Sequence, residues 1–88
     1  MEEDKQILVA LKKGQSHLGN VIKMVEDGRY CIDILQQNLA VIGLLKSANE
    51  KLFKRHLNSC FISAMRGTNE KRKKQMIEEI IKINKSSH

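Results

Sequence analysis

One uninterrupted stretch decides the fold: Tyr30–Met65, which reads YCIDILQQNLAVIGLLKSANEKLFKRHLNSCFISAM. It contains no proline and a single glycine, Gly43, so one long helix can pass through it. Along this helix a heptad-like seam recurs at alternating spacings of four and three residues. Two short neighbouring helices cannot cover such a seam, so we predict a homodimer built on paired, antiparallel second helices. The seam comprises Cys31, Leu35, Asn38, Ile42, Leu45, Asn49, Leu52 and His56, flanked by Ile34, Val41 and Ala48.

A shorter helix precedes this stretch, because apolar residues recur there at three- and four-residue spacing and line one face. We expect it to run from Glu3 to about Asp27 and to end at Gly28, a residue suited to a C-cap. Gly14 and Gly19 lie inside it and each cost about 1 kcal/mol relative to alanine, which close helix packing would offset. The apolar positions are Ile7, Leu8, Leu11, Leu18, Val21, Ile22 and Val25.

A third helix is expected after a turn at residues 67–69. Thr68 or Asn69 can cap it, and the helix should extend to about Asn84. The absence of proline and the 3% aromatic content argue against a sheet-rich fold. The sequence therefore predicts an all-α, three-helix protomer that forms a single domain over residues 1–88. The apolar positions of the third helix are Met76, Ile77, Ile80, Ile81 and Ile83.

The charge of the chain favours an anionic partner. It carries 16 Lys and Arg residues against 10 Asp and Glu, a net charge of +6. This excess favours nucleic acid over a membrane surface as the partner. No apolar run approaches the length of a membrane span, and the opening residues MEEDKQ are unlike a signal peptide, so we expect a cytoplasmic protein. We expect no enzymatic activity, because the sequence offers no Ser-His-acid arrangement and no glycine-rich phosphate loop.

Two thiols and one imidazole form a candidate metal site. His56 and Cys60 are four residues apart, so on a helix they share one face and can hold one ion. Cys31 lies on the order of 43 Å from Cys60 along a straight helix. In an antiparallel dimer that crosses near Leu45 and Lys46, Cys31 of one chain comes beside His56 and Cys60 of the other. Two sulfurs and one nitrogen suit Cu(I), whereas Zn(II) prefers a fourth ligand. From the spacing alone, cysteines that serve as small apolar residues also explain the pattern.

A longer pattern surrounds these residues: Tyr30-Cys31-Ile32-Asp33-Ile34-Leu35, then Gln37, Ala40 and Val41, then His56-Leu57 and Cys60. With it the chain resembles the CsoR-type copper-sensing repressors of bacteria, over roughly residues 11–81. The resemblance implies an all-α repressor whose dimers associate into a tetramer, as a dimer of dimers. It also implies that the metal-free form binds operator DNA and that Cu(I) releases it.

The same resemblance implies a role for individual residues. It places the Cu(I) ligands at Cys31 of one chain and at His56 and Cys60 of another. Tyr30 and Glu79 match positions that surround these ligands, in keeping with the rule that a ligating histidine is held by an outer hydrogen-bond partner.

Two alternatives stay open. One is a thiol or persulfide sensor in which an inter-chain Cys31–Cys60 bridge forms, although His56 argues against it. The other is a cytosolic copper-binding protein that does not bind DNA. Ala10 and Glu50 give this reading some weight, because they stand where relatives carry basic residues.

Basic residues on the first two helices are candidates for contacts with DNA phosphates, although each could also lie on an ordinary solvated helix face. The cluster Lys71–Lys74 is better interpreted as a solvated flank. We expect His17 to pack or to form a hydrogen bond rather than to bind copper, and we expect Met24, Met65 and Met76 to be core residues. The candidates for DNA contact are Lys12, Lys13, Lys23, Lys51, Lys54 and Arg55.

Overall fold

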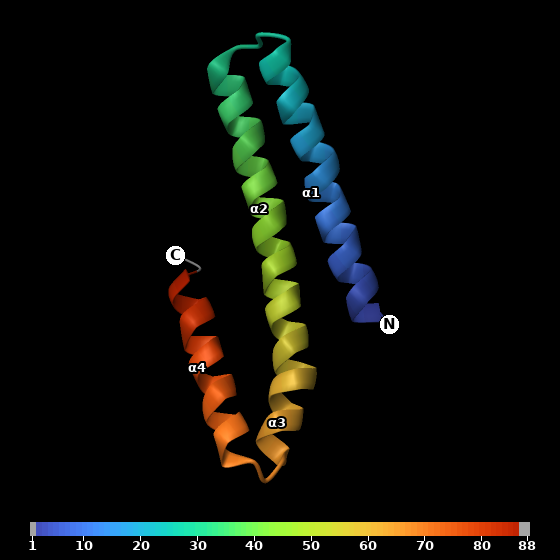
Figure 1. Ribbon diagram of the computed structural model, residues 1–88. Helices are drawn as coiled ribbons and strands as arrows, with labels where there is room; N and C mark the ends of the chain where they lie inside the picture. Colours follow the sequence, from blue (N-terminus) through green and yellow to red (C-terminus); the bar gives the residue numbers. More distant parts are fainter. Residues whose placement is uncertain (1, 87–88) are drawn as a thin grey trace. The chain divides into compact units, whose positions relative to one another are not determined.

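The computed structural model describes residues 2–86, and nearly all of them are helical (Figure 1). The elements are α1 (Glu2–Glu26), α2 (Cys31–His56), the π-helical segment η1 (Leu57–Phe61), α3 (Ile62–Arg66) and α4 (Glu70–Ser86). His56 and Ile62 both keep right-handed helical backbone angles, so α2, η1 and α3 form one continuous helical path. The predicted all-α protomer with three helices is thereby confirmed for the described residues. The π-helical segment was not expected from the sequence.

The chain divides into two compact units, one that reaches to Phe53 and one that starts at Lys54. The first is a hairpin of α1 and most of α2, and the second contains η1, α3 and α4. The prediction that residues 1–88 form a single domain stays a prediction. Among residues 2–86, none of the helices combines the length and the apolar character needed to cross a membrane.

The turn after α1 ends that helix at the predicted residue. Gly28 adopts the left-handed conformation, with a φ of 66°, and its N–H donates to the carbonyl of Val25 (3.1 Å). The N–H of Arg29 donates to the carbonyl of Met24 (3.0 Å), which completes a Schellman C-cap. The chain reverses at this cap, and α2 then lies beside α1 in the opposite direction (Figure 1).

Close packing of α1 against α2 depends on Gly14. A Cβ atom at this position would come 3.0 Å from Cδ2 of Leu45, so only glycine fits without a shift. The expectation that close helix packing offsets the cost of a glycine inside the helix is confirmed for Gly14. At Gly19 no described atom outside the local turn lies within 4 Å of such a Cβ, so packing within the chain does not offset the cost of this glycine. The buried residues of this unit are Ile7, Ala10, Gly14, Val21, Val41 and Ala48.

Large apolar side chains remain exposed on both helices of the hairpin. On α2 the flanking residues Val41 and Ala48 are 3% and 0% exposed, whereas Leu35 and Ile42 of the seam are 54% and 42% exposed. Most of the seam is thus uncovered in the single chain, whereas Asn38, Leu52 and His56 are half-buried. The apolar face predicted for α1 is only partly buried, because packing against α2 covers one edge of it. Its exposed residues are Leu8, Leu11, Leu18, Ile22 and Val25.

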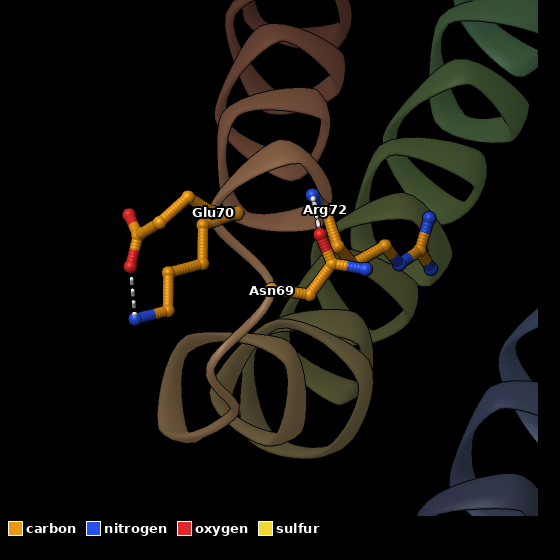
Figure 2. Close-up of polar contacts among 4 residues, drawn as sticks. Asn69, Glu70 and Arg72 are labelled. Carbon is orange, nitrogen blue, oxygen red and sulfur yellow. Dashed lines mark hydrogen bonds and ion pairs between the residues drawn. The ribbon is translucent and has the colours of Figure 1, made fainter.

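A turn at residues 67–69 leads into α4, and Asn69 caps that helix (Figure 2). Its Oδ1 accepts the N–H of Arg72 (3.1 Å), one of the N–H groups at a helix start that have no backbone partner. Asn69, and not Thr68, is therefore the N-cap. Lys73 pairs with Glu70 in the first turn (3.2 Å).

Candidate metal centre and basic surface

Cys31 is the first residue of α2 and carries an exposed, free thiol. The Schellman cap at Gly28 precedes it, and the carbonyl of Tyr30 accepts the N–H of Ile34 in the first turn of the helix (3.1 Å). Backbone hydrogen bonds therefore place Cys31 and leave its sulfur open to an ion or to a second chain.

His56 and Cys60 lie one helical turn apart where α2 continues into η1. His56 is the last residue of α2 and is half-buried, while Cys60 lies within η1 and carries an exposed, free thiol. In η1 the N–H of Ile62 donates to the carbonyl of Leu57, five residues earlier. That hydrogen bond defines a π-helix, a conformation found mostly as single turns inside α-helices and frequently at functional sites.

The predicted ligands form two separate groups. Among residues 2–86 of one chain, no three His, Cys, Asp or Glu side chains gather into a metal site. Cys31 and His56 are the first and last residues of α2, so one group is a lone thiol and the other is the imidazole–thiol pair. Both groups contain soft donors that suit Cu(I). The donor chemistry therefore fits the metal, and that the three predicted residues act as its ligands stays a prediction.

Tyr30 and Glu79 were predicted to surround the ligands. Tyr30 is exposed and directly precedes Cys31, and Glu79 is exposed on α4. Their roles around the metal stay predictions.

A groove of about 450 Å³ lies between α1 and α2 in the first unit. Three lysines line it, Lys5 and Lys13 from α1 and Lys51 from α2. The Nζ of Lys51 donates a hydrogen bond to Oγ of Ser47 (2.8 Å), one helical turn earlier. The remaining lining residues are Glu2, Gln6, Val9, Ala10, Leu44 and Ser47.

This groove brings together two of the six basic residues predicted to contact DNA, Lys13 and Lys51. Sequence reasoning missed Lys5, although it lies eight residues before Lys13, about two helical turns away on the same face. Ala10 also lines this groove. The other four predicted residues are exposed outside it: Lys12, Lys23, Lys54 and Arg55.

His17, the basic flank of α4 and Met76 behave as predicted, whereas Met24 and Met65 are less buried than expected of core residues. The Nε2 of His17 and the Oε1 of Gln37 are 2.9 Å apart, so a hydrogen bond links α1 to α2 and the expected role of His17 is confirmed. On the exposed flank of α4, the guanidinium of Arg72 donates to Oε1 of Gln75 (3.3 Å). Met76 is buried, as expected of a core methionine, while Met24 and Met65 are half-buried.

Comparison with known proteins decides the family. Residues 3–86 match the family described as metal-sensitive transcriptional repressor. The chain belongs to this family. Metal-sensitive transcriptional repressors are regulators and not enzymes, which confirms the expectation of no enzymatic activity and the resemblance drawn from the sequence.

Individual members of the metal-sensitive repressor family are similar over most of the chain. The copper-sensing transcriptional repressor CsoR of Mycobacterium ulcerans is 34% identical over 64 residues, which cover 73% of this chain and 55% of that protein. This chain thus spans about half the length of the mycobacterial relative. The CsoR of Bacillus subtilis is 31% identical over 86 residues, 97% of this chain and 85% of that protein.

A solved structure confirms the fold class. The crystal structure of the copper-sensing repressor CsoR with Cu(I) from Geobacillus thermodenitrificans NG80-2 matches with a TM-score of 0.84 at 37% sequence identity. The match covers 98% of this chain and 86% of that chain.

Proposed function

We propose that the protein is a Cu(I)-responsive transcriptional repressor. Its metal-free form binds operator DNA, and Cu(I) held by Cys31 of one chain with His56 and Cys60 of another releases that DNA. One observation carries the proposal: soft ligands stand at opposite ends of α2, in a chain whose fold matches a Cu(I)-bound repressor with a TM-score of 0.84. Two thiolates and an imidazole form a donor set that selects Cu(I).

An antiparallel pair of chains supports this ligand set. Reversing one α2 helix against another brings the start of the first beside the end of the second, so each pair would contain two equivalent sites. The exposed seam residues, among them Leu35, Ile42 and Leu45, supply an apolar surface for such a pairing. The exposed stripe of α1 supplies a second apolar surface, through which two dimers would form a tetramer.

The groove between α1 and α2 supports the DNA-binding half of the proposal. Around the cavity the three lysines Lys5, Lys13 and Lys51 outnumber the single carboxylate of Glu2, and lysines that neutralise phosphates give affinity without reading sequence. We infer that a phosphate of the DNA backbone occupies this groove, with Ser47 holding the ammonium of Lys51 in place. The lysines would thereby replace the basic residue that is missing at Ala10.

A matched pair of variants tests the groove. Lys13→Ala should weaken operator binding and lower the salt slope of the affinity by about one, because one phosphate contact is lost. Lys12→Ala removes the neighbouring lysine, which lies outside the groove, and should change the slope less. Equal effects of the two variants would contradict a specific role for the groove.

The whole proposal is tested by operator binding of the full chain with and without Cu(I), under anaerobic conditions, on the DNA upstream of its own gene. We expect the metal-free protein to bind this DNA and one equivalent of Cu(I) per chain to release it. Zn(II) serves as the metal control, and Cys60→Ala as the variant that should stay bound when Cu(I) is added. Operator binding that does not respond to bound Cu(I) would contradict the proposal.

The exposure of both free thiols favours one alternative, a persulfide-sensing repressor. In that case treatment with a persulfide donor should give a covalent dimer on a non-reducing gel, and either cysteine-to-alanine variant should abolish it. Binding of Cu(I) without any operator binding would instead indicate a copper-binding protein.

We place the protein in the cytoplasm, where operator DNA is found and thiols stay reduced.

A further inference from the structure

The π-helical turn η1 has no ordinary cause in the sequence. Its residues Leu57–Phe61 include neither proline nor glycine, the residues that most often disturb a helix. The backbone is regular on both sides, with φ and ψ of −59° and −45° at His56 and −61° and −43° at Ile62. The widening is therefore confined to the turn that contains Cys60, where a local interaction can favour it.

The hydroxyl of Ser59 supplies such an interaction. It donates to the backbone carbonyl of Arg55, four residues earlier, over 2.7 Å. A serine that bonds to this carbonyl competes with the helical hydrogen bonds of the backbone and often bends the helix. The same hydroxyl lies 3.9 Å from the Sγ of Cys60, so one side chain touches both the deformed backbone and a predicted ligand.

The widened turn changes how His56 and Cys60 face each other. In an α-helix of 3.6 residues per turn, residues four apart are offset by about 40° around the axis. A turn closed by a five-residue hydrogen bond takes more residues per revolution, so a spacing of four comes closer to one full turn. By this geometry the widened turn brings the backbone positions of His56 and Cys60 closer to one line along the helix than a regular α-helical turn would.

We propose that Ser59 is a positioning residue for the copper site: its hydroxyl holds the widened turn that aligns His56 with Cys60. This inference rests on the proposed function, because it concerns the same ligands. Ser59 itself does not bind the metal. It fixes the spacing of two ligands in the free protein, so that less reorganisation is needed on binding.

Three variants of the full chain test this role. Ser59→Ala removes the hydroxyl, Ser59→Thr keeps a hydroxyl that can reach the same carbonyl, and Ser63→Ala makes the same chemical change one turn later, outside η1. The first measurement is Cu(I) affinity by competition with a chelator. We expect Ser59→Ala to lose about tenfold, as is typical when an outer residue of a metal site is removed, and we expect the other two variants to match wild type.

The second measurement needs no metal. Backbone chemical shifts and amide exchange across residues 57–62 of the free protein should change in Ser59→Ala, as the turn reverts to an α-helix, and stay unchanged in Ser59→Thr. Unaltered Cu(I) affinity in Ser59→Ala would overturn the inference and leave the proposed function intact. A loss that Ser59→Thr does not restore, or that Ser63→Ala equals, would overturn it as well. A wild-type protein that does not bind Cu(I) would overturn the proposed function and this inference together.

Discussion

Gly28 and Gly19 occupy opposite kinds of backbone position, although both belong to the region of α1. Gly28 has a φ of 66°, a conformation that costs other residues about 1 kcal/mol or more. Gly19 lies inside the helix, with open space where a side chain would be added. The two glycines therefore offer a paired test of the cap.

Gly28→Ala should lower the free energy of unfolding by about 1 kcal/mol, because alanine resists the left-handed conformation. Gly19→Ala should raise it by about 0.5–1 kcal/mol, because alanine loses less entropy in a helix. Urea unfolding at one fixed protein concentration measures both, since assembly makes apparent stability depend on concentration. Destabilisation by Gly19→Ala would mean that a second chain packs against this position.

Replacing His56 should affect Cu(I) binding and DNA release differently from replacing either cysteine. His56→Ala leaves two thiolates, which are enough to hold Cu(I) in a two-coordinate state, so measurable binding should remain. The variant should nevertheless fail to release operator DNA, because the end of α2 is no longer tied to the metal through its imidazole. Titrations that follow Cu(I) binding and DNA release in parallel test this, with Cys31→Ala as the control that loses both. Normal release by His56→Ala would contradict three-ligand switching.

The helix ends are the elements that sequence predicts best here, because caps are local. Gly28 and Asn69 act through hydrogen bonds within a few residues of themselves, and both were expected at those positions. The widened turn η1 escaped prediction, since serine at position 59 is not a known helix breaker. The groove was not predicted from the sequence, in part because Lys5 and Lys51 come together only once α1 packs against α2.

The cap of α4 can be tested at the scale of that helix. Asn69→Ala removes the acceptor for the N–H of Arg72 and should cost about 1 kcal/mol of stability. Thr68→Ala changes the neighbouring residue, which could have capped the helix but does not, and should cost much less. Thermal unfolding followed by circular dichroism compares the two. A larger loss of stability for Thr68→Ala than for Asn69→Ala would contradict Asn69 as the N-cap.

At the scale of the whole molecule, the sequence indicated which residues are apolar but not which of them one chain buries. The same periodicity fits a face that packs within the protomer and a face that packs against another copy. Val41 and Ala48 are buried in the chain, while Leu35 and Ile42 beside them are exposed. The proposed arrangement of ligands is hidden for the same reason, because it would depend on a second chain.

Assembly should fail when charge enters the exposed seam. Ile42→Glu places a carboxylate on a surface that we expect to be covered, so the variant should dissociate to monomers at micromolar concentration. Gln36→Glu adds the same charge at an exposed residue of α2 outside the seam and should leave assembly intact. Analytical ultracentrifugation distinguishes the two outcomes. Unchanged assembly of Ile42→Glu would place the interface elsewhere, for example on the exposed stripe of α1.

The placement of Cys31 and His56 at opposite ends of α2 has a genetic consequence. A Cys31→Ala chain keeps the imidazole–thiol pair, and a Cys60→Ala chain keeps the other thiol, so each variant alone lacks a complete site. A mixed dimer of the two restores one intact site and loses the other. Two defective alleles expressed in one cell should therefore complement each other and regain part of the copper response. Two alleles that both carry Cys60→Ala cannot, and serve as the control.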